Sequence, residues 1–138
     1  MLPDFHAYAT YLYTLATKFP GIQSPEVNCF TLKSNTGIAN GVLHFSQDLR
    51  LHFVEHLDFN ARRITWYSYE IWQGNEKLCY YDPQEHPNDP TLASTHPHHK
   101  HLPPDIKHHR VPEPGLSFDQ PNLDFLIGEI EKMLGTLT

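Results

Sequence analysis

Histidine is concentrated in one short stretch of the chain, HPHHKHLPPDIKHHR, which runs from residue 96 to residue 110. The stretch holds six of the eleven histidines, and it also contains the cations Lys100, Lys107 and Arg110. Imidazole titrates near neutral pH and is also a common metal ligand. Three interpretations follow for this stretch: acid–base catalysis, metal binding, and a solvated loop whose histidines do no chemistry.

The acid–base interpretation depends on two histidines sharing one face of a strand. In an extended segment alternate side chains project together, so His99 and His101 are expected on one face and Lys100 on the other. Metal-free RNA cleavage needs a base, an acid and a cation for the charged phosphorane. His99 and His101 would serve as base and acid in either order. The cation would be Lys100 if it turned toward the site, and otherwise Lys107 or Arg110.

Residues outside this stretch would assist either chemistry. Tyr81 and Asp82 end the preceding strand, where they would orient an imidazole or contact a phosphate. For a metal site, His99 and His101 would supply two nitrogens, and the tetrahedron would be completed by His86, His96, Asp82 or Asp89. Motifs such as HExxH and CxxC are absent, and the prediction includes no cofactor. The predicted catalytic residues are His99, His101, Lys100, His86, Tyr81 and Asp82.

Length and composition restrict the class of protein. A chain of 138 residues, 39% of them hydrophobic, is expected to form one domain with its own core. A net charge of −6 argues against broad electrostatic capture of nucleic acid. The N-terminal segment carries Asp4 in place of a basic patch, and no apolar run is long enough to span a membrane. We therefore expect a cytoplasmic protein without a membrane partner, in which Cys29 and Cys79 are buried free thiols.

Hydrophobic periodicity predicts the elements that position the histidines. Apolar residues recur every three or four positions in residues 3–18 and 121–135, which indicates a helix near each end. Between them the period is two, and turn signals at residues 35–37 and 73–76 indicate an antiparallel meander. Eight of the twelve prolines lie in residues 82–116, which predicts a functional loop with a short strand at 97–102. The expected fold is a single α+β domain over residues 1–138, with about five antiparallel strands and both terminal helices on one face.

The other face of this sheet and the loop at about residues 82–116 are expected to form a groove. Glu55 lies in the strand segment LHFVEHL, at a position where alternation points toward the core. Two interpretations of Glu55 are open, an inward carboxylate near the site and a strand-edge acid, and the second is favoured.

Four segments taken in order, LHFVEHLDF, YSYEIW, KLCYYDPQEHP and PHHKHLPP, resemble the TumE-type toxin family of prokaryotic toxin–antitoxin modules. That family has an acidic residue in a strand, a Tyr-x-Tyr strand, a strand ending in Tyr-Asp before a His-Pro step, and a His-His-Lys-His segment. It often has two histidines where this chain has Glu85-His86, and an aromatic residue where this chain has His96. The matching positions are Glu55, Tyr67, Tyr69, Tyr81, Asp82, His86, Pro87, His98, His99, Lys100 and His101.

The resemblance implies a growth-inhibiting protein that a cognate antitoxin holds inactive. RNA cleavage is the activity expected by analogy with other small toxins. Two alternatives stay open: an interaction protein whose histidine-rich loop binds a partner, and a histidine-based metal-binding protein. An exposed edge strand in so aromatic a sheet would favour a homodimer.

Overall fold

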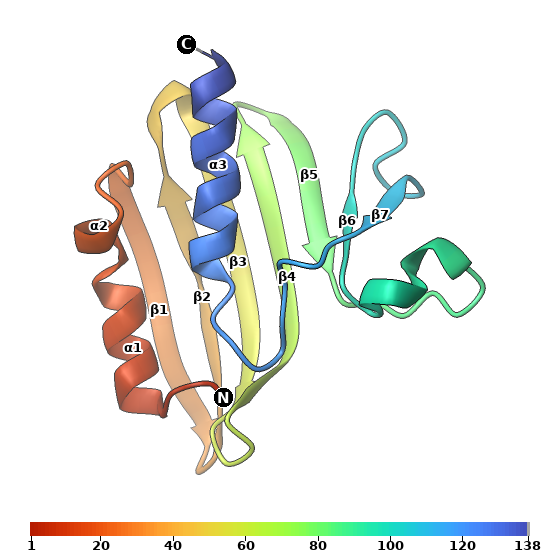
Figure 1. The fold of residues 1–138 in the computed structure, drawn as a ribbon. Coiled ribbons are helices and arrows are strands. Elements are labelled where there is room, and N and C mark those ends of the chain that lie inside the picture. The colour runs from red at the N-terminus through yellow and green to blue at the C-terminus, as the bar shows by residue number, and fades with distance from the viewer. Residues whose placement is uncertain (138) are drawn as a thin grey trace.

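The period-two pattern of residues 24–82 forms five antiparallel strands, each paired with the next along the chain. The computed structural model describes residues 1–137, and within them two further short strands, β6 and β7, extend the same sheet (Figure 1). The strand order is the chain order, β1 to β7. The strands are β1 (Ser24–Lys33), β2 (Thr36–His44), β3 (Leu49–Asp58), β4 (Arg63–Gln73), β5 (Glu76–Asp82), β6 (His99–His101) and β7 (Arg110–Pro112).

The expectation of about five strands is wrong, because the sheet of the described residues has seven. β6 lies inside the predicted segment 97–102, whereas β7 was not predicted. Each of the two contains three residues, which is too short for an alternating pattern to be recognised. Pairing with β5 defines β6, and pairing with β6 defines β7.

Helices at both ends of the chain cover one face of the sheet, as expected (Figure 1). The predicted N-terminal helix is divided at Thr14 into α1 (Phe5–Tyr13) and α2 (Leu15–Lys18). Asp4 caps α1 by accepting a hydrogen bond of 2.9 Å from the backbone N–H of Ala7. The C-terminal helix α3 spans Leu123–Leu137. Two 3-10 turns, η1 (Ser46–Asp48) and η2 (Pro90–Thr95), complete the elements.

The core lies between these helices and the sheet. One alternating set of strand side chains is buried there with the apolar side chains of the helices, as the pattern predicted. Close packing of β2 requires glycine at position 41, because a Cβ there would lie 2.0 Å from the carbonyl oxygen of Glu26. Cys79 is a buried free thiol and Cys29 a half-buried one. The largest fully buried side chains are Tyr8, Tyr67, Tyr69, Tyr81 and Phe53.

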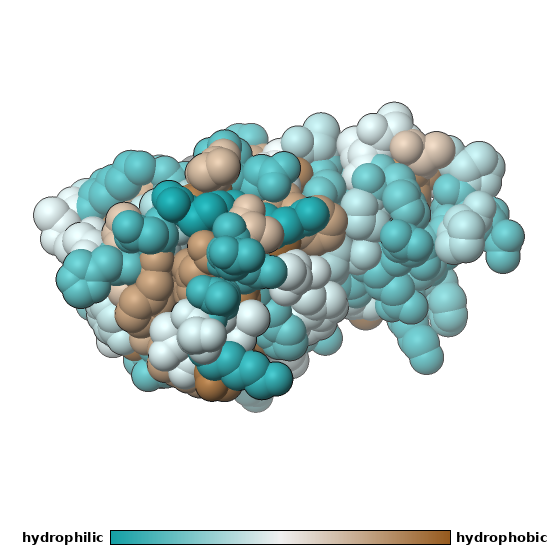
Figure 2. All heavy atoms as spheres, turned by 90° about the horizontal axis from the view of Figure 1, so that it is seen from below, coloured by the Kyte–Doolittle hydropathy of each residue, from teal (hydrophilic) through white to brown (hydrophobic). Residues whose placement is uncertain are grey.

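The proline-rich segment 83–116 forms an extension beside the main sheet, and it contains η2, β6 and β7 (Figure 1). Seen from below, this extension is largely hydrophilic, whereas apolar side chains gather on the larger part of the molecule (Figure 2). None of the helices described within residues 1–137 is both long and apolar enough to cross a membrane.

Candidate functional site

The strand pairing β5–β6 brings three of the predicted site residues together, Asp82, His99 and His101. Asp82 lies opposite His99, and Tyr80 lies opposite His101, in the register of β5 and β6. Alternation puts Tyr80 and Asp82 on one face of β5, and it puts His99 and His101 on the same face of β6. Because cross-strand neighbours are close together, two imidazoles and one carboxylate meet at this place.

The three groups converge on one point. Nε2 of His99 lies 3.0 Å from Nε2 of His101 and 2.8 Å from Oδ1 of Asp82. Nε2 of His101 lies 3.6 Å from Oδ2 of the same carboxylate. His99 has an exposed fraction of 0% and His101 of 3%, so this contact is shielded from solvent. We call His86, His99, His101 and Asp82 the histidine cluster.

Backbone carbonyls fix the orientation of both buried rings. Nδ1 of His99 lies 2.8 Å from the carbonyl oxygen of Pro97, and Nδ1 of His101 lies 3.0 Å from that of Ile106. A carbonyl oxygen only accepts, so each Nδ1 carries a hydrogen, and the neutral ring has its lone pair on Nε2. The ring of Tyr80 stacks on His101 with centroids 3.9 Å apart. Both Nε2 lone pairs are therefore directed toward the shared centre.

Asp82 supplies the negative charge of the cluster. Burial opposes its ionisation, but hydrogen bonds from His101 and His99, which these rings donate through Nε2 when they are protonated, outweigh that effect and lower the pKa of the carboxyl below its usual value. Oδ1 also accepts the backbone N–H of Gln84 at 3.1 Å, which holds the carboxylate in place after β5 ends. The carboxylate is thus ionised and faces both imidazoles.

His86 connects the cluster to solvent. Its ring meets that of His99 edge-on, with centroids 4.8 Å apart. A ring nitrogen of His86 and those of His99 and His101 all lie within 4.8 Å of one another. Burial and the nearby charge of Arg110 lower the pKa of His86. The residue is half-buried, so it is the accessible histidine of the cluster.

A hollow of about 400 Å³ opens beside His86. Arg110 of β7 lies in it, with Nε 3.7 Å from Oδ2 of Asp89. β7 carries Arg110 opposite His101, which is why this cation lies next to the cluster. The lining residues are Glu85, His86, Pro87, Asn88, Asp89 and Arg110.

Two of the predicted catalytic residues lie on the opposite face of the sheet. Lys100 pairs with Tyr81 in the register of β5 and β6, and its ammonium lies 5.4 Å from the centroid of the Tyr81 ring. Tyr81 is buried in the core, where its hydroxyl lies near the thiol of Cys79. Alternation thus keeps Lys100 and Tyr81 apart from the cluster, and Arg110 is the cation that the fold brings to it.

Glu55 is an inward carboxylate, so the favoured interpretation as a strand-edge acid is wrong. It is fully buried, and the hydroxyls of Tyr8 and Tyr69 donate hydrogen bonds to its two carboxylate oxygens. The hydroxyl of Tyr69 in turn accepts a hydrogen bond of 3.0 Å from Asn122. This network joins α1, β3, β4 and the residue before α3, and it faces the helices. We call Glu55, Tyr8, Tyr69 and Asn122 the buried carboxyl network.

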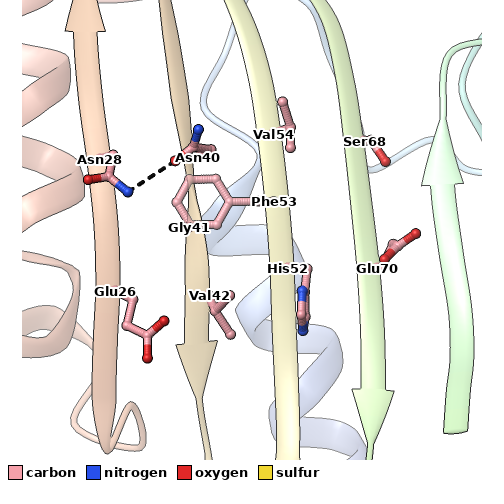
Figure 3. Close-up of a pocket in the computed structure, with 10 residues that line it drawn as sticks. All are labelled: Glu26, Asn28, Asn40, Gly41, Val42, His52, Phe53, Val54, Ser68 and Glu70. Atoms are coloured by element: carbon pink, nitrogen blue, oxygen red, sulfur yellow. Dashed lines mark hydrogen bonds between the residues drawn. The ribbon is translucent and has the colours of Figure 1, made fainter. Parts of the chain in front are cut away.

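A larger hollow, of about 500 Å³, lies on the open face of β1 to β4 (Figure 3). Asn28 and Asn40 make a hydrogen bond of 3.2 Å across its wall, and Glu26, Glu70 and His52 also line it. None of its lining residues within the described chain is a lysine or an arginine. Both hollows are lined by two acids, but the one beside His86 also contains Arg110, so we place the candidate site at the histidine cluster.

Comparison with known families agrees with the strand motifs that converge here. The family model described as Toxin TumE matches residues 12–134. The chain belongs to the TumE toxin family. The family points to the toxin component of a toxin–antitoxin module, and it implies a cognate antitoxin as partner. No significant match was found among curated proteins or among solved structures.

The motif residues of this TumE-family chain divide between the two faces of the sheet. Tyr69 and Glu55 belong to the buried carboxyl network, and the hydroxyl of Tyr67 lies 2.6 Å from Nδ1 of His98. Asp82 and His86 belong to the histidine cluster on the other face. Where the family often has two histidines, this chain has Glu85-His86. Oε1 of Glu85 lies 3.6 Å from Nε2 of His96, whereas His86 belongs to the histidine cluster. The chain therefore keeps the histidine that contacts His99.

Sequence reasoning missed Tyr80, which stacks on the histidine cluster, and it missed Tyr8 and Asn122 of the buried carboxyl network. Tyr80 could have been found, because it shares a strand face with Asp82, whereas Tyr81 does not. Tyr8 and Asn122 carry no sequence signal that connects them to Glu55, since they lie far from it in the chain. The carbonyl groups that orient His99 and His101 are set by the path of the backbone and could not be predicted from side-chain types.

Proposed function

We propose that this TumE-family toxin cleaves RNA, and that the histidine cluster is its reaction centre. The observation that carries the proposal is the convergence of Nε2 of His99, Nε2 of His101 and the carboxylate of Asp82 at distances of 2.8–3.6 Å. Buried titratable side chains that lie close together, next to an accessible hollow, are typical of reaction centres.

A phosphodiester suits the surroundings of the cluster. Cleavage of RNA builds up negative charge on the phosphate, and a positioned guanidinium stabilises that charge. Arg110 lies in the hollow that reaches the cluster through His86, where its present partner is Asp89 at 3.7 Å, a contact that a phosphate would replace. A phosphate bound by Arg110 would therefore have an imidazole within its reach.

The geometry favours the cluster as one joint centre over two separate catalysts. In-line displacement at phosphorus puts the entering and leaving oxygens on opposite sides, so a separate base and acid must also stand on opposite sides. Nε2 of His99 and Nε2 of His101 are 3.0 Å apart, which leaves no room for a phosphate between them. His99 and His101 would thus act together at one of the two oxygens, with the hollow leading to them.

Growth and RNA integrity test the proposal. Cells expressing the wild-type protein should stop growing and lose intact RNA, whereas cells expressing His99→Ala/His101→Ala should grow with intact RNA. The matched control is His108→Ala/His109→Ala, because these two histidines lie in the same stretch but are exposed and outside the cluster. The control should remain as toxic as the wild type.

Folding and partner binding must be measured for each variant. His99→Ala/His101→Ala should retain its circular dichroism spectrum and its binding to the antitoxin. His86→Ala removes a half-buried ring and provides a variant that does not empty the core. If both variants arrest growth as the wild type does, with RNA intact, the protein acts by binding a target and the proposal is rejected.

A further inference from the structure

The centre of the histidine cluster requires a positive charge. The Nδ1 hydrogens of His99 and His101 point to carbonyl oxygens, so the Nε2 lone pairs of the neutral rings face each other at 3.0 Å. Two oxygens of the Asp82 side chain face the same point, at 2.8 Å from Nε2 of His99 and 3.6 Å from Nε2 of His101. Electron-rich atoms at such distances repel one another unless a cation lies between them.

One proton satisfies this arrangement poorly. A proton on Nε2 of His99 can point to Oδ1 of Asp82 at 2.8 Å or to Nε2 of His101 at 3.0 Å, but a good hydrogen bond to one leaves the other weak. A metal ion accepts all the lone pairs at once. Tetrahedral coordination at about 2.0 Å puts neighbouring ligand atoms about 3.3 Å apart. Nε2 of His99 lies 2.8 Å from Oδ1 of Asp82 and 3.0 Å from Nε2 of His101, which lies 3.6 Å from Oδ2 of Asp82. These distances lie on both sides of about 3.3 Å.

The hydrogen bonds at Nδ1 are those of metal-binding histidines. A histidine that binds a metal through one nitrogen commonly donates the other N–H to a carboxylate or a backbone carbonyl, which fixes both tautomer and ring orientation. His99 and His101 each do so, through Pro97 and Ile106. The stacking of Tyr80 on His101 fixes that ring further.

His86 offers a further ligand. Its Nε2 is buried, and no residue in the described chain makes a hydrogen bond to it. One of its ring nitrogens lies within 4.8 Å of those of both buried histidines. A buried polar atom without a partner is costly, and coordination would remove that cost. His86 lies in the segment after β5, so a small movement of this segment would bring it into coordination distance.

We propose that His99, His101, His86 and Asp82 bind one divalent transition-metal ion, with Zn²⁺ as the best-suited ion. Three imidazole nitrogens and one carboxylate oxygen form a donor set that suits Zn²⁺. The cluster contains no thiol, since Cys79 lies on the helix-facing side of β5. This inference deepens the proposed function by naming the cofactor of the same centre, where Nε2 of His99 and Nε2 of His101 would hold the ion in place of exchanging protons with RNA. Its catalytic relevance rests on that function, whereas the binding itself does not.

Metal content tests the inference directly. Protein without a polyhistidine tag, dialysed against metal-free buffer after incubation with Zn²⁺, should retain about one zinc per chain by elemental analysis. Added Zn²⁺ should raise the melting temperature of the metal-free protein. Cobalt(II) should give the intense visible absorption of a tetrahedral site.

Variants distinguish the cluster from the other histidines. His86→Ala and Asp82→Asn should weaken Zn²⁺ binding tenfold or more, and His99→Ala/His101→Ala should abolish it. His108→Ala/His109→Ala should keep the full zinc content. The inference is overturned if the wild type is recovered without metal and its melting temperature does not respond to Zn²⁺, or if zinc content is the same in all cluster variants.

These readouts are independent of RNA cleavage. A protein that binds zinc at the cluster but leaves RNA intact supports the metal site and rejects the proposed function. A protein that cleaves RNA, yet binds zinc neither in the wild type nor in His108→Ala/His109→Ala, rejects the metal site and leaves the proposed function standing.

Discussion

Under the proposed function, Asp82→Asn is expected to lower RNA cleavage by about 100-fold while the chain stays folded. The carboxylate is the negative group that faces Nε2 of both His99 and His101. An asparagine has nearly the same shape and keeps an oxygen that can accept the backbone N–H of Gln84. It lacks the charge that stabilises a proton or a metal ion between the imidazoles. Cleavage rates of purified wild-type and variant protein, measured with the same RNA, check this expectation.

The matched control for this change is Asp105→Asn. Asp105 also contacts a histidine, with Oδ2 3.0 Å from Nδ1 of His108, but both residues are exposed. Solvent weakens such a contact, so Asp105→Asn should leave the cleavage rate unchanged. Equal losses in both variants, or full activity in Asp82→Asn, would contradict the role given to the cluster.

Glu55→Ala is expected to lower the free energy of unfolding by about 3 kcal/mol. The change leaves the buried hydroxyls of Tyr8 and Tyr69 without their acceptor, at a cost of about 1–3 kcal/mol each. The change also leaves a cavity in the core. Because burial of the carboxyl is itself unfavourable, the net loss is smaller than the sum of these costs. Urea denaturation measures the loss, which is large for a domain stable by about 5–15 kcal/mol.

Glu70→Ala is the control for the loss of stability. Glu70 lies on the open face of β4, about a third exposed, and its Oε2 is 3.3 Å from Nζ of Lys77. A part-exposed ion pair contributes about 1 kcal/mol or less, and the hydrogen bond of 3.0 Å that Glu70 accepts from Nε1 of Trp72 contributes about 1 kcal/mol, so the control should lose less than Glu55→Ala. A loss for Glu55→Ala no larger than that of Glu70→Ala would show that the buried carboxyl network does not support the fold.

The same carboxyl predicts how stability depends on pH. Burial raises the pKa of Glu55 above 4.5, although hydrogen bonds from Tyr69 and Tyr8 oppose the shift. The folded chain thus holds this proton to higher pH than the unfolded chain does. Stability should fall as pH rises above about 4.5 toward the folded pKa, by up to about 1.4 kcal/mol per pH unit.

Glu55→Gln isolates this titration, because glutamine does not ionise. The difference in unfolding free energy between the wild type and Glu55→Gln, measured by urea denaturation at several pH values, should decrease over that window. A difference that stays constant, or that increases with pH, would contradict a raised pKa.

The strand face shared by His99 and His101 could be read from the sequence, because alternation is a local property of extended backbone. The same rule opposes a place for Lys100 beside the pair, and the structure keeps it on the other face. The helices at both ends and the strands up to residue 82 also follow from local periodicity and turn residues. Family membership follows from the order of short motifs, since it needs no contact between them.

Other features depend on contacts between distant parts of the chain. β7 exists because it pairs with β6, and that pairing brings Arg110 to the hollow. The 3.0 Å contact between the imidazoles depends on carbonyl groups whose positions follow from the backbone path around β6. Glu55 is buried because α1 and the segment before α3 supply Tyr8 and Asn122 around it.

The sequence by itself determined an α+β chain of the TumE toxin family with two histidines on one strand face. The tertiary structure decided that His86 and Asp82 join those histidines, and that Tyr81 and Lys100 do not. The physical reason is that alternation along the backbone fixes the face of the strand from which a side chain projects. Strand pairing and the path of the connecting loops fix which side chains from different strands lie next to one another.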